Sequence, residues 1–325
     1  MDLTITPTKL HGAVTPPPSK SQAHRLLIAA ALSGGVSTIH NLADSQDIAA
    51  TRRCLAALGA RIDELGENTV QVRGLGNVTV EAGPAPILDC GESGSTLRFL
   101  IPLALLVNGE AAFTGHGRLM ERPLKPYEDL FREKGIAWKW ENGRLTVDGG
   151  RGYGDCALAP GEYRLPGNVS SQFFTGLLFT LPLLNGDSTL MSTTPLESRD
   201  YLELTRQAQA LAGVRSRWQG DVLFIPGGQR YQPFTASVEA DWSQAAFWYA
   251  ANFLGGEVDV RGLDLPGQLQ VVPALQRRGG NQGGVPVQQG QDKQQPGEEL
   301  AGHVAGEAVF SRVQSQTVIA PAAVH

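Results

Sequence analysis

The sequence predicts an α/β protein assembled from repeated β/α units, a mixed class that is also written α+β. Two different blocks of sequence recur along the chain, and their order is the same in each copy. One block carries an apolar helix, and the other carries an amphipathic helix followed by two short strands. Chance similarity among helix–turn–strand units is the alternative, and the matched order of two unlike blocks argues against it.

The first block opens with small polar residues and continues as an apolar helix. Its four copies read PPPSKSQAHRLLIAAAL (16–32), GESGSTLRFLIPLALLVNG (91–109), GNVSSQFFTGLLFTLPLLNG (167–186) and EADWSQAAFWYAANFLGG (239–256). Serines hold equivalent places in the four copies: Ser21, Ser95, Ser171 and Ser243. Because the helix bodies are apolar, we expect them to be buried.

The second block lies between copies of the first. Its three copies read CLAALGARIDELGENTVQVRG (54–74), LFREKGIAWKWENGRLTVDGG (130–150) and ALAGVRSRWQGDVLFIPGG (210–228). Each predicts an amphipathic helix that ends at a glycine (Gly59, Gly135 or Gly213), then a short strand, a turn and an alternating strand.

The repeats predict the division of the chain into domains. Three copies extend over residues 16–236, and a fourth copy begins near residue 239. Residues 268–325 are rich in Gln and Gly and show no sustained period, so we expect an aberrant, disordered tail there.

Composition excludes several classes of protein. The chain has 325 residues, of which 42% are hydrophobic and 18% are charged, and this is typical of a globular protein. A net charge of −5 provides no basic field for nucleic acid. Three widely spaced cysteines, Cys54, Cys90 and Cys156, indicate reduced thiols. With no signal peptide or membrane span in the pattern, we expect a cytoplasmic protein with no membrane or nucleic-acid partner.

The first turns of the apolar helices are the candidate functional sites. A helix N-terminus offers unpaired N–H groups and about half a positive charge, which suits a phosphate or carboxylate. The residues that we expect around such a site are Lys20, Ser21, Arg25, Gly91, Ser93, Gly94, Ser95, Arg98, Ser170, Ser171 and Gln172, with Arg118, Arg122, Lys125, Ser198, Arg199 and Tyr201 from two connecting segments.

A simpler interpretation remains open for these residues. Each serine can be a helix cap, the cations can be ordinary surface charge, and Arg98 can belong to a structural ion pair. The sequence shows no nucleophile–base pair and no metal-binding cluster, and its glycines fit neither a dinucleotide fingerprint nor a P-loop.

Five stretches, in this order, resemble the 5-enolpyruvylshikimate-3-phosphate synthase (3-phosphoshikimate 1-carboxyvinyltransferase) family: PSKSQAHR, DCGESGSTLRF, MERPLKPY, GNVSSQF and SRDY. The resemblance spans residues 1–265. It implies the enolpyruvyl transferase fold, in which each of two similar domains has three β/α units. Residues 16–236 would then be one complete domain that binds the substrates, and residues 1–15 and 237–267 would be a remnant of the second domain. The resemblance also implies transfer of the enolpyruvyl group of phosphoenolpyruvate to the 5-hydroxyl of shikimate 3-phosphate, with release of phosphate, without a metal or organic cofactor and by a monomer.

The resemblance also implies roles for individual residues. Lys20 would be catalytic and touch both substrates. Shikimate 3-phosphate would be held by Ser21, Arg25, Ser170, Ser171 and Ser198. Gln172 would lie between the substrates, and Gly94 and Arg122 would line the phosphoenolpyruvate site.

The sequence departs from the family pattern in two respects. Glu92 stands where some members carry Asn, and the second-domain Asp, Glu, Arg and Lys groups have no matching positions in this chain. One alternative is therefore a non-catalytic remnant that at most binds shikimate 3-phosphate. Another is an enolpyruvyl transferase for a UDP-amino sugar, for which we would expect Asn after Lys20 and a Cys in GRLMERP; neither is present.

Overall fold

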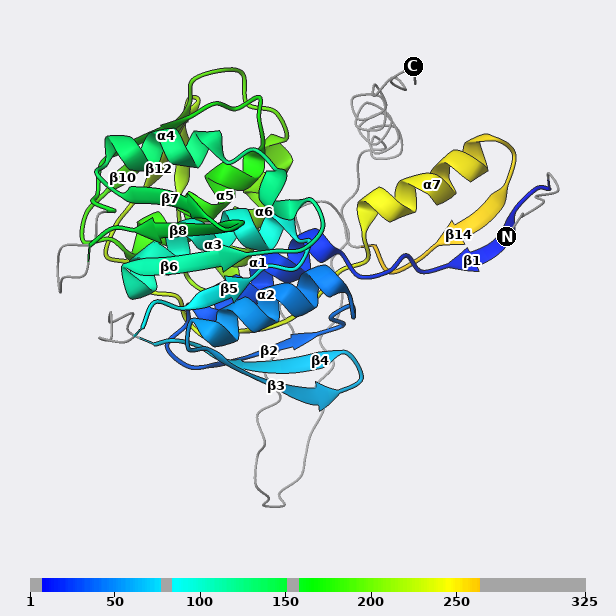
Figure 1. Ribbon diagram of the computed structural model, residues 1–325. Coiled ribbons are helices and arrows are strands. Elements are labelled where there is room, and N and C mark those ends of the chain that lie inside the picture. The colour runs from blue at the N-terminus through cyan, green and yellow to red at the C-terminus, as the bar shows by residue number, and fades with distance from the viewer. Residues whose placement is uncertain (1–7, 77–83, 151–157, 264–325) are drawn as a thin grey trace, which may run out of the picture. The chain divides into compact units, whose positions relative to one another are not determined.

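A computed structural model describes residues 8–76, 84–150 and 158–263 (Figure 1). The chain forms three four-stranded sheets and one two-stranded sheet in this part. Helices and sheets are mixed throughout, so the predicted α/β class is confirmed. The predicted tail, residues 268–325, lies outside the described residues.

The second and third repeats share one order of elements, strand–helix–strand–helix–strand–strand. The second repeat comprises β5 (Ile87–Asp89), α3 (Gly94–Asn108), β6 (Glu110–Thr114), α4 (Lys125–Glu133), β7 (Ala137–Glu141) and β8 (Arg144–Asp148). The third comprises β9 (Glu162–Leu165), α5 (Ser171–Thr180), β10 (Ser188–Ser192), α6 (Arg199–Leu211), β11 (Arg217–Gln219) and β12 (Val222–Ile225). Short 3₁₀ helices lie at Leu119–Glu121 and Leu181–Leu183.

The first repeat takes its leading strand from a distant part of the chain. It comprises α1 (Lys20–Ala31), β2 (Val36–His40), α2 (Gln46–Ala57), β3 (Arg61–Gly66) and β4 (Thr69–Arg73). Strand β13 (Thr235–Ser237) pairs in parallel with β2, Thr235 opposite Thr38. It occupies the place that β5 holds beside β6 and β9 holds beside β10. The first sheet is therefore complete only when the chain returns to it after the third repeat.

Strands β1 (His11–Val14) and β14 (Glu257–Val260) form the two-stranded sheet. They pair in parallel, with His11 opposite Glu257. Helix α7 (Trp242–Phe253) precedes β14 as α1 precedes β2. The segments predicted to form a second-domain remnant thus pair with each other.

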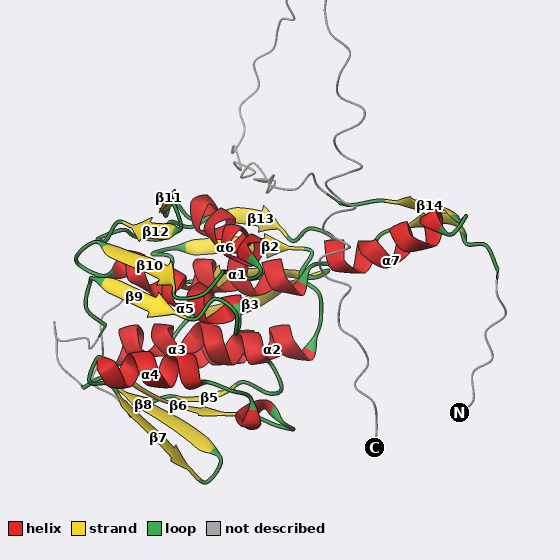
Figure 2. Ribbon diagram, turned by 90° about the horizontal axis from the view of Figure 1, so that it is seen from above, coloured by secondary structure: helices red, strands yellow, loops and turns green. Residues whose placement is uncertain are grey.

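Helices of two kinds fill the space between the sheets (Figure 2). Helices α1, α3 and α5 are apolar and almost wholly buried, as their sequence pattern predicts. Helices α2, α4 and α6 are amphipathic, and each is followed by a glycine with positive φ: Gly59, Gly135 and Gly213. A side chain is strained in this conformation, which explains why glycine ends each of these helices.

Helix α7 departs from the expectation of burial. Its sequence is apolar, yet Ala245 is its only buried residue in the structure, and Phe247, Phe253 and Leu254 are exposed. The physical reason lies in its neighbours, because among the described residues α7 packs mainly on β14, whereas α3 and α5 pack on each other.

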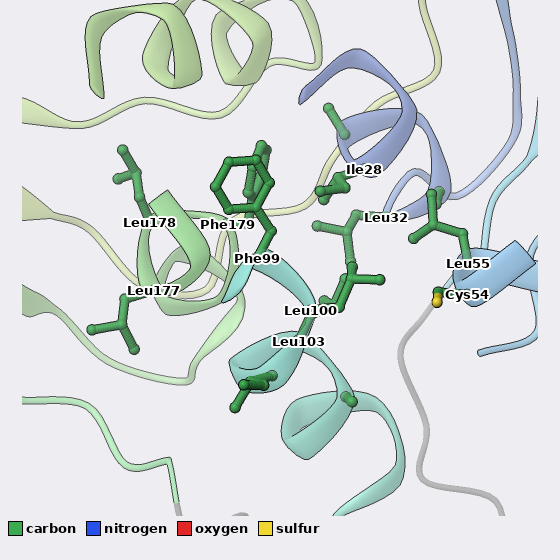
Figure 3. Close-up of a cluster of buried hydrophobic side chains, with 14 of the residues drawn as sticks. Ile28, Leu32, Cys54, Leu55, Phe99, Leu100, Leu103, Leu177, Leu178 and Phe179 are labelled. Atoms are coloured by element: carbon green, nitrogen blue, oxygen red, sulfur yellow. The ribbon is translucent and has the colours of Figure 1, made fainter. Parts of the chain in front are cut away.

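The core joins side chains from all three repeats. Figure 3 shows Ile28 of α1 and Leu32, which directly follows α1, near Phe99 and Leu100 of α3, with Phe179 of α5 beside Phe99. The rings of Phe99 and Phe179 lie 6.3 Å apart, centroid to centroid. In the part of the chain that the structure describes, no helix is long and apolar enough to span a bilayer.

Helices α3 and α5 approach most closely at Gly176. Pro102 lies inside α3 and has no N–H to donate to the Arg98 carbonyl one turn earlier. Gly176 of α5 faces this carbonyl, and a Cβ at position 176 would lie 2.6 Å from the Arg98 oxygen and 3.0 Å from Pro102 Cγ. The Tyr127 hydroxyl, which donates to the Phe173 carbonyl at 2.7 Å, would be closer still.

Gly176→Ala is therefore expected to destabilise the protein by about 1–3 kcal/mol, because backbone and a buried ring must move to admit one methyl group. Urea unfolding of the full chain measures the loss. Gly34→Ala is the matched control: its Cβ would meet nothing closer than the Gly76 Cα at 4.0 Å, and we expect a change within about 0.5 kcal/mol. Equal stability of the Gly176 variant and the wild type would contradict the close packing.

Candidate anion-binding site

Five helices begin at the same end of the structure. The Gln172 side chain at the start of α5 bonds Ser95 at the start of α3, at 2.9 Å. Arg25 of α1 bonds Thr205 in the second turn of α6, at 2.8 Å. Contacts between neighbours close the ring, since α2 packs on α1 and α3, α5 packs on α3, and α6 packs on α5 and α1. The positive ends of these helix dipoles therefore gather in one region.

Serines of the first turns divide into caps and non-caps. Ser19, Ser93 and Ser170 cap α1, α3 and α5 by accepting from a backbone N–H within the first turn. The capping interpretation therefore holds for Ser170, although its hydroxyl hydrogen remains able to donate. The structure assigns no capping bond to Ser21, Ser95 or Ser171, which lie one or two residues after these caps.

Ser198 precedes α6 in a strained conformation. Its φ of 59° is in the left-handed region, and its side chain makes no capping hydrogen bond. A serine pays a conformational cost there that glycine would avoid. The geometry thus leaves the hydroxyl available beside the first turn of α6.

Arg25 is a buried cation without a carboxylate partner. Its side chain donates to Thr205 Oγ1 at 2.8 Å, to the Ser21 carbonyl at 2.6 Å and to the Tyr201 carbonyl at 3.1 Å. The guanidinium carbon lies 5.2 Å from the ring centre of Phe99. Burial lowers the pKa of Arg25 to about 9, so the group stays charged at neutral pH. In the described part of the chain, no acidic side chain forms an ion pair with it.

Two further arginines converge on Gly94. A Cβ at Gly94 would lie 2.7 Å from one Arg122 nitrogen and 3.7 Å from an Arg98 nitrogen. Arg98 donates to Gln172 Oε1 at 2.6 Å, while its buried Nε has no partner among the described residues. Burial, and then the charge of Arg122, lower the pKa of Arg98. Two neighbouring guanidinium groups without a carboxylate are suited to bind an anion.

Lys20 is exposed and is paired with an acid. Its Nζ lies 2.9 Å from Asp47 Oδ2, at the start of α2. An anion in this region would have to share Lys20 with Asp47. Glu92 lies elsewhere, since its carboxylate oxygen is 2.6 Å from the place that a Cβ at Gly117 would take.

Three of the predicted cations have other partners. Arg118 pairs with Glu121 and Lys125 pairs with Asp129, both on the exposed surface. The guanidinium of Arg199 lies 3.9 Å from the centre of the Trp218 ring. These contacts favour the surface-charge interpretation for Arg118, Lys125 and Arg199.

Sequence reasoning missed a buried polar chain beneath the site. His24 Nδ1 lies 2.7 Å from Thr51 Oγ1, which lies 2.6 Å from Thr96 Oγ1. Burial, and then the charge of Arg25, lower the pKa of His24 to about 3. The available signal was Thr51 itself, a polar residue three positions from Ile48 and from Cys54 on the buried face of α2.

In the described residues, no group of three or more His, Cys, Asp or Glu side chains is placed to hold a metal ion. The site instead combines helix N-termini, serine hydroxyls, an amide and unpaired guanidinium groups. This combination suits an anionic small molecule that carries phosphate or carboxylate groups.

Fold and site together define a protein of repeated β/α units with a candidate anion-binding face at the N-terminal ends of its helices. The family model of EPSP synthase (3-phosphoshikimate 1-carboxyvinyltransferase) matches residues 5–310. The chain therefore belongs to the EPSP synthase family, and the predicted resemblance is confirmed.

Relatives in several Clostridium species carry the name 3-phosphoshikimate 1-carboxyvinyltransferase. The protein of Clostridium kluyveri is 45% identical over 265 residues, which are 81% of this chain and 60% of the relative. A protein of Clostridium perfringens is 43% identical over 264 residues, with 80% and 60% covered. The chain thus spans about 60% of the length of these relatives.

Solved structures agree with the fold. An EPSP synthase of Acinetobacter baumannii, determined at 2.37 Å, matches with a TM-score of 0.65 and 22% identity, over 78% of this chain and 56% of that one. A second structure of EPSP synthase from the same organism matches with a TM-score of 0.65 and 23% identity.

The buried His24 is expected to make stability depend on pH. The unfolded chain protonates this histidine near its ordinary pKa of 6.5, whereas the folded protein does so only near 3. Stability from this group is therefore complete above pH 6.5 and is lost as pH falls toward 3. Between pH 7 and pH 5 the loss is roughly 2 kcal/mol.

Urea unfolding at both pH values measures this loss as the difference between the wild type and His24→Asn, because the other titrating groups are common to both proteins. His11→Asn, at an exposed position of β1, is the control. Identical pH slopes for the wild type and His24→Asn would contradict a buried neutral imidazole.

Proposed function

We propose that the anion-binding site binds shikimate 3-phosphate and phosphoenolpyruvate, and that it belongs to a 3-phosphoshikimate 1-carboxyvinyltransferase. One observation carries the proposal: Arg25, Arg98 and Arg122 lie where five helices begin, and no acidic side chain of the described residues pairs with them. The chain has a net charge of −5, so a local cluster of positive charge without carboxylate partners favours the binding of an anionic ligand. Membership of the EPSP synthase family suggests which anions these are, namely shikimate 3-phosphate and phosphoenolpyruvate.

Shikimate 3-phosphate is assigned to the side of α1, α5 and α6. Arg25 and Ser21 hold it from α1, and Ser170, Ser171 and Ser198 donate to its phosphate and ring hydroxyls. Support comes from Arg25, whose hydrogen bonds to α6 already place its charge between the first turns of α1 and α6.

Phosphoenolpyruvate is assigned to the side of α3. The two guanidinium groups at Gly94 provide the charge, and the absent Cβ leaves room for the ligand beside Arg122. Gln172 bonds both Ser95 and Arg98, so its amide stands between the α3 and α5 groups. Lys20 is assigned to both ligands as the catalytic residue.

The reaction implied is addition followed by elimination. C3 of phosphoenolpyruvate gains a proton while the 5-hydroxyl of shikimate 3-phosphate loses one and attacks C2. The tetrahedral intermediate then loses a proton from C3 and expels phosphate, which restores the double bond of the enolpyruvyl group. The contribution of this site is to hold two anions in contact despite their repulsion and to orient the hydroxyl toward C2. Lys20 offsets the developing charge and assists proton movement.

Residues 16–236 are proposed as the complete domain that holds this site, with 1–15 and 237–267 as part of a second domain. The pairing of β1 with β14 supports this division. The proposal includes a cytoplasmic monomer, supported for its location by the unpaired buried thiols of Cys54 and Cys90. Specificity for a UDP-amino sugar is not favoured, because the matched relatives carry the name 3-phosphoshikimate 1-carboxyvinyltransferase.

Arg25→Ala is expected to weaken shikimate 3-phosphate binding at least about tenfold, because the ligand phosphate loses a charged donor. Isothermal titration calorimetry on the full chain measures the affinity. Arg61→Ala is the control, since Arg61 is exposed on β3 and pairs with Asp63. Arg25→Lys keeps the charge, so it separates loss of the ligand contact from misfolding. Unchanged affinity in Arg25→Ala would remove this residue from the site.

The 325-residue chain is expected to bind shikimate 3-phosphate while releasing phosphate at least about 100-fold more slowly than a full-length relative. The reason is that the family takes acid–base groups from the part of the relatives that this chain does not span, and one such group contributes about 10²–10⁴-fold. A phosphate-release assay with both substrates measures the rate. Turnover equal to that of a relative would show that this chain holds all the groups required and would exclude the binding-only alternative.

A further inference from the structure

We propose that His24 is a positioning residue: its neutral imidazole, through the hydroxyls of Thr51 and Thr96, fixes the first turn of α3 relative to α1. The inference rests on the proposed function, since it concerns how the phosphoenolpyruvate side of the site is held at its distance from Lys20 and Arg25. This positioning role requires neither a charge on His24 nor a movement of its side chain.

The hydrogen-bond chain runs through three helices. His24 of α1 lies 2.7 Å from Thr51 of α2, and Thr51 lies 2.6 Å from Thr96 of α3. Thr96 donates to Ser93 Oγ at 2.8 Å, and its backbone N–H bonds the same oxygen at 3.2 Å. All four residues are buried, with at most 3% of any one exposed. We call these residues the His24 relay.

Counting hydrogens gives the relay a direction. A hydroxyl has one hydrogen to donate, and that of Thr96 is directed to Ser93 Oγ at 2.8 Å, with the Asp47 carbonyl at 3.5 Å as a second acceptor. Thr51 must therefore donate to Thr96, which leaves Thr51 only an acceptor for His24. The Nδ1 of His24 must then carry the hydrogen of the ring. The relay accordingly places a hydrogen on Nδ1 of His24. Because burial, and then the charge of Arg25, lower the pKa of His24 to about 3, Nε2 carries none at neutral pH, and the ring is the neutral Nδ1–H tautomer.

Charges around the ring agree with a neutral imidazole. Arg25 and Lys20 on its own helix oppose a positive charge on the ring, and Asp47 of α2 favours one. The Asp47 carboxylate is paired with Lys20 at 2.9 Å, so its effect is offset. His24 also meets Phe99 edge to face, with 6.3 Å between ring centres, and this contact fixes the plane of the ring.

Adjacent residues of α1 are tied to opposite sides of the helix ring. His24 bonds toward α2 and α3, whereas Arg25 bonds Thr205 of α6, whose hydroxyl lies 3.2 Å from Thr175 of α5. Loss of the Thr51 hydroxyl would therefore release the α3 side and leave Arg25 held. The effect should fall on Gly94 and Arg98 of α3, the side of the site that is assigned to phosphoenolpyruvate.

Thr51→Val tests this separation of the two sides. We expect phosphoenolpyruvate affinity, measured by calorimetry with shikimate 3-phosphate present, to fall about tenfold. Affinity for shikimate 3-phosphate alone should stay within about twofold. Thr51→Ser keeps the hydroxyl and should restore phosphoenolpyruvate affinity to within about threefold of the wild type.

Thr180→Val is the matched control. Thr180 is as buried as Thr51, but its hydroxyl donates to Gly176 within α5, at the far end of that helix. We expect both affinities of this variant to stay within about twofold of the wild type. Equal losses for both ligands in Thr51→Val, or the same losses in Thr180→Val, would overturn the positioning role.

Nuclear magnetic resonance on the full chain tests the relay without ligands. In protein with ¹⁵N-labelled histidine, the His24 signals, assigned by their loss in His24→Asn, should show a neutral ring protonated at Nδ1 from pH 5 to pH 8. Exchange of the Thr96 amide should quicken about tenfold in Thr51→Val and stay unchanged in Thr180→Val. An Nε2–H ring, or Thr96 exchange that does not respond to Thr51→Val, would overturn the proposal. A wild type that binds neither ligand would contradict the proposed function, while these two readouts would still decide the relay.

Discussion

The common direction of α1, α2, α3, α5 and α6 is the constraint on which the rest of the structure depends. Parallel helices place like ends of their dipoles together, and the N-terminal ends meet here beside three arginines. Such an arrangement is electrostatically unfavourable by itself. It is held by the burial of apolar helix bodies, among which Phe99 and Phe179 are central. The same apolar bodies confine the polar side chains to the first turns.

Burial of charge without a countercharge requires a dense set of neutral partners. Arg25 receives them from a threonine hydroxyl, two carbonyls and the faces of two aromatic rings. Arg98 has fewer, and its Nε is left without a partner in the described residues. Neutral partners of this kind solvate a cation without cancelling its charge. The site therefore keeps its attraction for an anion while the fold remains stable.

Strands that are far apart in the sequence pair near both ends of the described chain. The first sheet needs β13, and β1 pairs with β14 rather than with the strands that follow it. The segments around Pro18 and Ala240 meet at a single bridge between these two pairings. As a result, the three-repeat body cannot complete its first sheet until residue 237 has been reached. The internal repeat thus governs the pairing of strands as well as the order of helices.

The sequence by itself determined the repeat, the two kinds of helix and the glycines that end α2, α4 and α6. These features depend on local patterns, since apolar periodicity and positive φ are properties of neighbouring residues. It also indicated that Lys20, Arg25 and Arg98 would lie at the starts of helices. The family followed from motifs in a fixed order.

Only the tertiary structure decided which of these groups meet. Sequence patterns cannot show that Thr51 hydrogen-bonds Thr96, that Asp47 pairs with Lys20 or that β13 completes the first sheet. Each of these contacts joins segments at least 27 residues apart. Nor could they show that α7 is exposed, because burial of an apolar helix depends on which neighbours pack against it. Local physics determined the elements, and packing at long range determined the site.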